Sequence, residues 1–236
     1  MPPPASHAQT APAGKRERNK LEKYRRIKAS ARQLFEEKGY QDATIRDIAK
    51  HAGVGLGTLF LYARDKRDLL FLLFEDELNE VTDRAFDTVK PDTPLVDQLV
   101  DAFRVFFDYF ALSPRVSQDM MREVVFYVKS INEINSFHTG IARTHERLAR
   151  FVARAQALDL VTTSYAPDDL ARLIFSIYRM DVRSCFATEP LDVAAGLARL
   201  RHNLDILFIG IRPQAATPRP TRRGPELNRP EPQYSE

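Results

Sequence analysis

The sequence predicts an all-α protein of about nine helices, and three observations support this fold class. Apolar residues recur at the three- and four-residue spacings of amphipathic helices between residues 19 and 211. No segment shows the sustained two-residue alternation with β-branched side chains that is typical of strands. Four of the 15 prolines lie in residues 1–12 and six in residues 213–232, so the chain between these ends carries few helix breakers.

The first predicted helix covers residues 19–38 and ends at Gly39, a residue type that readily adopts the left-handed conformation after a helix. Its inward face is apolar and consists of Tyr24, Ile27, Ala31, Leu34 and Phe35. Two short helices follow, one that starts at Thr44 and one over about Gly55–Tyr62.

A long fourth helix is expected from Asp65 to about Val89. Asp65 is a good N-cap residue, and Asp68 stands three residues later, as in a capping box. The five remaining helices are expected over residues 96–110, 121–128, 132–158, 167–188 and 190–211. Several helix starts are marked by a capping position followed by proline, in Thr93-Pro94, Ser113-Pro114, Ala166-Pro167 and Glu189-Pro190.

Charge is distributed unevenly along the chain. The formal net charge of +3 is the result of a charge of +8 on residues 1–67 and −5 on the remainder. A basic first quarter indicates that a polyanion-binding part lies at the N-terminus, although a solvated basic helix would have the same composition. The single cysteine, Cys185, fits a reducing cytosol, and we expect a small buried apolar side chain there rather than a redox sensor.

The sequence carries no signature of catalysis. It lacks a glycine-rich phosphate loop, a nucleophile elbow, an HExxH motif and paired cysteines, so we expect no enzyme activity and no cofactor. The longest apolar run, Leu69–Phe74, has six residues, against the roughly 20 that cross a bilayer. The N-terminus also lacks the pattern of a secretory signal. These features predict a cytoplasmic protein.

Two histidines, His138 and His145, lie seven residues apart on one face of a predicted helix with Ile141 and Leu148. They fit ordinary core or rim side chains, and they also fit polar anchors for a ligand. A metal site needs a third ligand that no local motif supplies, and we expect none.

Residues 44–66 fit two short helices that cross at a tight turn. Ile45, Ile48 and Ala49 form the buried face of the first helix, and Ala49 is small enough for a close crossing. Gly53 supplies the left-handed residue that a three-residue turn requires. Val54 then packs the second helix against the first. A helix of that size fits the major groove of DNA.

This region resembles the DNA-binding region of the TetR/AcrR family of transcriptional repressors. The resemblance covers residues 20–70 and rests on Thr44-Ile45-Arg46-Asp47-Ile48-Ala49, Gly53-Val54, Gly57-Thr58-Leu59, Tyr62, Lys66 and Leu69-Leu70. It implies phosphate contacts from Thr44, Thr58, Tyr62 and Lys66. The sequence departs from the family pattern at Gly55, Phe60, Leu61 and Ala63. A helical hairpin with no role in DNA binding is the alternative.

The residues expected to face DNA are Thr44, Arg46, Gly55, Leu56, Gly57, Thr58, Phe60, Leu61, Tyr62 and Lys66. Leu56 and Leu61 are predicted to contact thymine methyl groups, because a leucine offers no hydrogen bond to a base. The basic run in residues 15–20 either reaches a minor groove or phosphates, or is a solvated lead-in to the first helix.

The resemblance further implies a larger domain that encloses a small molecule and pairs through its last two helices. The expected cavity is lined by Phe103, Phe107, Met121, Phe137, Ile141, His145 and Tyr178. Its ligand should be hydrophobic or aromatic with one hydrogen-bonding end near His145 or Tyr178. The expected homodimer seam is the stripe formed by Leu197, Leu204 and Ile211.

The predicted organisation has four parts: a disordered basic arm (1–17), a helix-turn-helix domain (18–67), an effector-binding and dimerisation domain (68–211) and a disordered Pro-rich tail (212–236). The predicted function is a ligand-responsive regulator, most simply a repressor, that binds operator DNA as a dimer. An architectural DNA-binding protein without an effector and a helical enzyme or ligand carrier that does not bind DNA are the alternatives. An enclosed cavity would favour the regulator.

Overall fold

The computed structural model describes the backbone of residues 14–126 and 136–211, and the side chains of residues 14–124 and 140–211. This part of the chain contains nine α-helices and no strand, which confirms the predicted all-α class. The helices are α1 (Lys15–Lys38), α2 (Ile45–His51), α3 (Leu56–Leu59), α4 (Lys66–Asp87), α5 (Leu95–Ala111), α6 (Pro114–Phe126), α7 (Ser136–Ala157), α8 (Pro167–Phe186) and α9 (Val193–Gly210).

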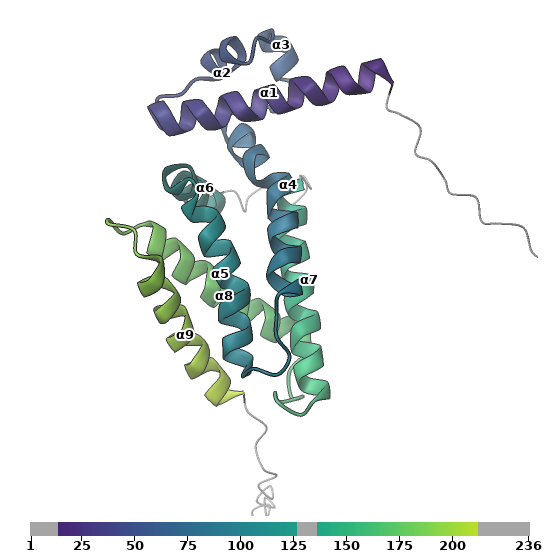
Figure 1. Cartoon of the computed structure of the whole chain (residues 1–236), viewed down its shortest axis with the longest axis vertical. Helices are drawn as coiled ribbons and strands as arrows, with labels where there is room; N and C mark the ends of the chain where they lie inside the picture. Colours follow the sequence, from purple (N-terminus) through teal and green to yellow (C-terminus); the bar gives the residue numbers. More distant parts are fainter. Residues whose placement is uncertain (1–13, 127–135, 212–236) are drawn as a thin grey trace, which may run out of the picture.

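Helices α1, α2 and α3 gather at one end of the molecule, and α5 to α9 form a second body beneath them (Figure 1). Helix α4 runs from the first group into the second, where it packs between α5 and α7. None of the described helices combines the length and the apolar composition that a bilayer-spanning segment needs.

Side-chain caps set several of the helix starts. Thr44, Asp65 and Asp192 accept hydrogen bonds from backbone N–H groups three residues later, at 3.1, 2.7 and 2.9 Å. The cap at Asp65 confirms the predicted start of α4. The cap at Asp192 explains why α9 begins three residues after Pro190, where the proline pattern predicted the start.

The other proline signals are partly correct. Pro114 and Pro167 are the first residues of α6 and α8, as predicted, whereas Pro94 precedes α5 as its N-cap residue. Gly39 ends α1 with a φ of 86°, as the sequence indicated. The predicted start of the seventh helix at Asn132 lies outside the described residues.

Helix α1 begins at Lys15, four residues before the predicted start, so residues 15–17 are helical and do not belong to a disordered arm. Lysine, arginine and glutamate are good helix formers, and Glu17 in the first turn interacts favourably with the positive end of the helix dipole. Residues 1–13 and the predicted tail, 212–236, lie outside the described part of the chain.

The crossing of α8 and α9 is unusually close. A Cβ atom added at Gly196 would lie 2.6 Å from the Sγ atom of Cys185 and 2.9 Å from Phe107. Cys185 is buried, which confirms the expected small apolar side chain, and burial raises the pKa of its thiol. The thiol therefore stays protonated and packs as a core group.

Asp181 is a buried carboxylate that joins the same two helices. Its Oδ1 atom accepts a hydrogen bond from Nε of Arg199 at 3.0 Å, and its Oδ2 atom accepts one from Asn203 at 2.8 Å. Both partners belong to α9 of the same chain. The fold therefore uses this charge internally, to fix α9 on α8.

The predicted dimer seam is wrong in its residues. Leu197, Leu204 and Ile211 are buried within the single chain, where α9 packs on α5 and α8. The core of the chain itself covers this stripe. The outer faces of α8 and α9 instead expose other large apolar side chains, namely Leu173, Met180, Ile206 and Ile209.

We expect Arg199→Ala to lower the free energy of unfolding by about 3 kcal/mol, because it leaves the Asp181 carboxylate buried without its charged partner. Arg172→Ala is the matched control, since Arg172 forms an exposed pair with Asp168 and should cost less than about 1 kcal/mol. Urea unfolding at a fixed protein concentration measures both. Equal losses would contradict a structural role for the buried pair.

Candidate helix-turn-helix surface and ligand cavity

Helices α2 and α3 form the predicted helix-turn-helix pair. Gly53, in the turn between them, has a φ of 61°, the left-handed conformation that the sequence indicated. The backbone N–H of Val54 donates to the carbonyl of Ala49 at 3.0 Å, which closes the turn. Ile48, Ala49 and Leu59 are buried beneath the pair, so its geometry is held by packing.

Helix α1 supports this pair from below. Arg26 donates to the carbonyl oxygen of Gly53 at 3.2 Å, and Nδ1 of His51 lies 3.0 Å from the hydroxyl of Ser30. Hydrogen bonds from Lys38 and Thr44 lower the pKa of Asp47, which keeps its carboxylate charged at the start of α2. Two contacts, at His51 and at Gly53, therefore hold the turn against α1. The sequence did not single out the role of Arg26.

The outer face of α3 is exposed and largely apolar. Leu61 has 83% of its surface exposed, and Leu56 and Phe60 are also exposed. The expected contacts Gly55 and Gly57 lie on the same exposed stretch, with Thr58 half-buried among them. On α2, Arg46 and Lys50 are exposed and have no ion-pair partner among the described residues.

Three of the expected phosphate-binding side chains already make contacts within the protein. The hydroxyl of Tyr62 donates to the carbonyl of Lys20 at 3.2 Å, and Thr44 caps α2. Lys66 donates to the carbonyl of Gln41 at 2.8 Å and lies over the ring of Tyr40. These contacts fix the side chains at the ends of the motif, and the ammonium group of Lys66 retains two further donors.

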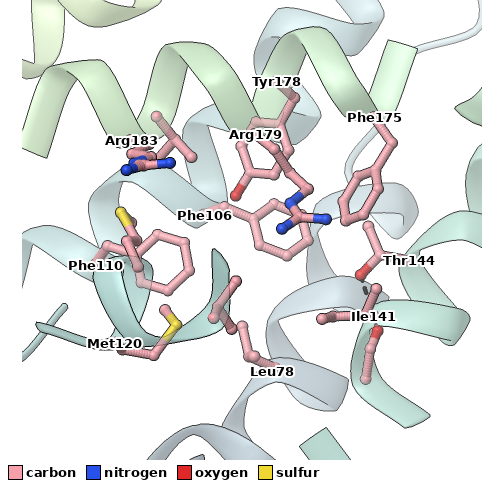
Figure 2. Close-up of a pocket in the computed structure, with 14 residues that line it drawn as sticks. Leu78, Phe106, Phe110, Met120, Ile141, Thr144, Phe175, Tyr178, Arg179 and Arg183 are labelled. Atoms are coloured by element: carbon pink, nitrogen blue, oxygen red, sulfur yellow. Dashed lines mark hydrogen bonds between the residues drawn. The ribbon is translucent and has the colours of Figure 1, made fainter. Parts of the chain in front are cut away.

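A partly open cavity of about 90 Å³ lies in the second body, between α4, α5, α6, α7 and α8 (Figure 2). Its wall is mainly aromatic and aliphatic and consists of Leu78, Phe106, Phe110, Met120, Met121, Val124, Gly140, Ile141, Thr144, Phe175, Tyr178, Arg179, Val182 and Arg183. The volume is below the several hundred Å³ that is usual for a ligand pocket. A ligand of that size would therefore have to displace flexible wall side chains such as Met120 and Met121.

Three of the seven residues expected to line this cavity do so: Met121, Ile141 and Tyr178. Phe103 and Phe107 do not line it, because both are fully buried in the core, where the Phe103 ring stacks on Tyr178 at 4.3 Å. His145 does not line it either, since its Nδ1 atom faces Asp168 at 3.7 Å. The side chain of Phe137 lies outside the described residues.

Several wall residues were missed. Phe106 and Phe110 line the cavity from α5 in place of their neighbours Phe103 and Phe107. Arg179 and Arg183, which the sequence analysis did not single out, also border the cavity. The available signal was the position of Arg179 one helical turn after the aromatic residue Phe175.

Tyr178 is a buried polar residue of the cavity wall. Its side chain is 4% exposed, and no hydrogen-bond partner for its hydroxyl occurs in the described part of the chain. Figure 2 shows the hydroxyl oxygen pointing toward the space beside Phe106 and Phe110. Burial raises the pKa of Tyr178 far above its usual value, so the hydroxyl stays a proton donor.

Helix α6 joins the cavity to the helix-turn-helix end. Met120 and Met121 line the cavity, and from the start of the same helix Arg115 donates to the carbonyl of Glu36 on α1 at 3.3 Å. The hydroxyl of Ser113, just before α6, donates to the Glu36 carboxylate at 2.6 Å. A displacement of α6 at the cavity would therefore reach α1 directly.

The described side chains include no group of three or more His, Cys, Asp or Glu residues placed to hold a metal ion.

Comparison with known proteins gives matches in both parts of the molecule. Residues 27–73 match the family model described as bacterial regulatory proteins, tetR family. The fatty acid metabolism regulator protein of Bacillus subtilis (strain 168) is 30% identical over 94 residues. That match covers 40% of this chain and 48% of the relative, so this chain spans about half the length of the curated protein that it matches.

Solved structures extend the likeness to most of the chain. FadR of Thermus thermophilus, a TetR-family repressor in complex with lauroyl-CoA, matches 83% of this chain and 98% of its own, with a TM-score of 0.64 and 20% identity. SmeT in a complex with triclosan matches 78% of this chain and 90% of its own, with a TM-score of 0.54 and 18% identity. At these identities the likeness establishes the fold.

We expect Gly53→Ala to destabilise the helix-turn-helix by about 1 kcal/mol, because an L side chain is strained at a φ of 61°. Gly57→Ala is the control, since Gly57 lies inside α3 and an added Cβ there meets no atom within 4 Å. It should leave stability unchanged or slightly higher. Thermal unfolding compares the two variants, and an equal loss in both would rule out the turn conformation as the cause.

Proposed function

The chain belongs to the tetR family of bacterial regulatory proteins, and from this premise we propose that it binds operator DNA as a homodimer and releases it when an apolar small molecule fills the cavity. The observation that carries the proposal is the exposed face of α3, held by a glycine turn against α2 and α1. The family is one of regulatory proteins and not of enzymes, in keeping with the expectation of no catalytic activity.

Two features support DNA as the partner of α3. The first 67 residues carry a charge of +8, and Arg46 and Lys50 on the neighbouring helix are exposed. Positive side chains on the helix that precedes α3 suit the phosphates on either side of a major groove. The apolar tip formed by Leu56 and Leu61 suits a thymine methyl group, which is exposed in that groove.

The outer faces of α8 and α9 support a homodimer. Leu173, Ile206 and Gly210 line one shallow groove, so the two helices share a continuous apolar surface. Met180 extends this surface along α8 and is 65% exposed. An apolar patch of this kind is rarely left open on a monomer, and a two-fold axis through it would carry a second helix-turn-helix to the next half-site.

The aromatic and aliphatic wall of the cavity supports an apolar effector. Two proteins of similar fold are described in complex with lauroyl-CoA and with triclosan, and each of these molecules has a large apolar part. Because the cavity of about 90 Å³ is small, a ligand fits only after the wall has moved. The ligand then binds more tightly to the conformation with the opened wall than to the one with the closed wall. This difference in affinity is the condition for a ligand to shift the equilibrium between the two conformations.

Helices α4 and α6 would transmit this movement. Leu78 and Met120 contribute to the cavity wall from these two helices, and both helices contact α1. A movement of α1 displaces α3 in each subunit, which changes the spacing of the two recognition helices on the DNA. The cavity supports a regulator with an effector, but it is partly open, so the enclosed cavity expected to distinguish this regulator from an architectural protein is not found among the described residues.

We expect Leu61→Ala to change the base preference at particular operator positions, since it removes an exposed apolar contact to the base edges. Lys50→Ala should weaken binding evenly across sequences and reduce the slope of log K against log salt by about one. Selection from a random DNA library followed by fluorescence anisotropy measures both effects. Leu21→Ala, an exposed leucine on α1, is the control. If the wild-type protein selects no sequence from the library, the DNA-binding proposal is wrong.

We expect Met180→Glu to produce monomers, because it places a charge in the middle of the proposed interface. Leu112→Glu is the control, since Leu112 is 77% exposed at the C-terminal end of α5 and does not line the groove between α8 and α9. Light scattering at several concentrations, with circular dichroism to verify folding, distinguishes the two. A stable dimer in the Met180 variant would place the interface on another surface.

A further inference from the structure

The cavity of the second body has a charged border on one side. Arg179 and Arg183 lie one turn apart on α8, and both line the cavity. Figure 2 shows the guanidinium group of Arg179 beside Phe106 and Phe175, and that of Arg183 on the side toward Phe110. The border therefore places two permanent positive charges against an otherwise apolar wall.

Neither of these arginines has a carboxylate partner among the residues that the structure describes. Other arginines of the same body do: Arg143 binds Asp83 at 2.6 Å, Arg172 binds Asp168 at 3.1 Å, and Arg201 binds Asp97 at 2.5 Å. The described wall of the cavity includes no Asp or Glu side chain. Arg179 contacts the ring of Phe175 instead, at 5.9 Å. Both arginine side chains are exposed, so no carboxylate of the described residues compensates their charge and water solvates it.

A second pocket of about 180 Å³ adjoins this border. It shares Met121 and Arg183 with the cavity, and its remaining wall includes Gln118 and Arg122. Arg122 is already paired with Asp119 at 3.3 Å, whereas Arg183 has no carboxylate partner among the described side chains. An apolar space therefore continues into a polar one at Arg183, which is the arrangement that suits a molecule with one apolar and one charged end.

The buried hydroxyl of Tyr178 adds a second polar anchor. It is aimed into the cavity and has no partner in the described part of the chain (Figure 2). A ligand oxygen in the cavity could accept a hydrogen bond from this hydroxyl. Tyr178 precedes Arg179 in the chain, and Arg183 lies one turn after Arg179, so the three groups border the same cavity from one short stretch of α8.

From these observations we propose that the effector is an anionic amphiphile, whose apolar chain occupies the cavity and whose negatively charged end lies at Arg179 and Arg183. The inference rests on the proposed function, since it names the chemical class of the effector. A carboxylate on a free acyl chain and a phosphate on an acyl thioester of coenzyme A share this chemistry. A neutral apolar molecule fills the same space but leaves the two arginines without a partner.

Isothermal titration calorimetry with three compounds of equal chain length tests the charge. We expect the wild-type protein to bind octanoate at least about tenfold more tightly than 1-octanol, and octylammonium most weakly, because only the anion gains the two charge-assisted contacts. Octanoyl-CoA is the fourth compound. Tighter binding of octanoate identifies the carboxylate as the charged group, and tighter binding of octanoyl-CoA identifies the phosphates.

Variants locate the charge. The double variant Arg179→Gln/Arg183→Gln should lose about tenfold in affinity for the preferred anion and change the affinity for 1-octanol less than twofold. Tyr178→Phe should lose about tenfold for every ligand that places an oxygen at its hydroxyl. Arg172→Gln is the matched control, because Arg172 lies on the same helix two turns earlier and is paired with Asp168. It should bind all four compounds as the wild type does.

Equal wild-type affinities for octanoate, octanoyl-CoA and 1-octanol would overturn the inference, as would a preference for the anion that survives in the double variant or the absence of any binding. Fluorescence anisotropy with operator DNA separates this result from the proposed function. Release of DNA by 1-octanol alone would support the proposed regulator and refute the proposal that its effector is an anion. Charge-selective binding that does not change DNA affinity would support the anionic ligand and refute its role in regulation.

Discussion

The carboxylate of Glu77 on α4 is the interaction on which the relation between the two bodies depends. It accepts hydrogen bonds from Arg32 of α1 at 2.9 and 3.0 Å and from the hydroxyl of Tyr109 of α5 at 2.7 Å. Burial and this hydrogen bond raise the pKa of Tyr109, so its hydroxyl remains a donor. A single side chain thus ties α1 to α4 and α5. Since Glu77 is one residue from Leu78 in the cavity wall, any rotation of α4 that relocates Leu78 also changes these hydrogen bonds.

The sequence was a good guide to local structure wherever one residue type determines the backbone. Thr44 and Asp65 cap their helices, and Gly39 and Gly53 have positive φ angles, because few other residues satisfy those backbone positions. These four residues were enough to place the helix-turn-helix. The start of α9 was predicted incorrectly because a proline and an aspartate two residues apart both offered a start, and the side-chain cap of Asp192 determined it.

Burial was less predictable than helix position. Helix α9 is apolar on more than one side: Leu197, Leu200 and Leu204 are buried, whereas Ile206 and Ile209 are exposed. A periodic stripe identifies a face that needs cover but not whether the same chain or a partner provides it. The same ambiguity affected α5, where Phe103, Phe106, Phe107 and Phe110 are all buried and only two of them reach the cavity. Which ring lines a cavity depends on the rotation of the helix by less than one residue, and that rotation is set by tertiary packing.

If the proposed effector binds in this cavity, the positions of the charged groups explain how it would act at a distance. Arg179 and Arg183, which have no carboxylate partner among the described residues, lie on α8, and the buried Asp181 joins this helix to α9. A ligand anchored there by its charge would direct its apolar chain against α4 and α6, the helices of the wall that contact α1. The coupling between two such sites is typically 1–3 kcal/mol. This free energy equals the net contribution of one or two hydrogen bonds. Ser113 and Arg115 form two such bonds with Glu36, where α6 contacts α1. Loss of these contacts on ligand binding would be sufficient to shift the equilibrium, without any change in the fold of either body.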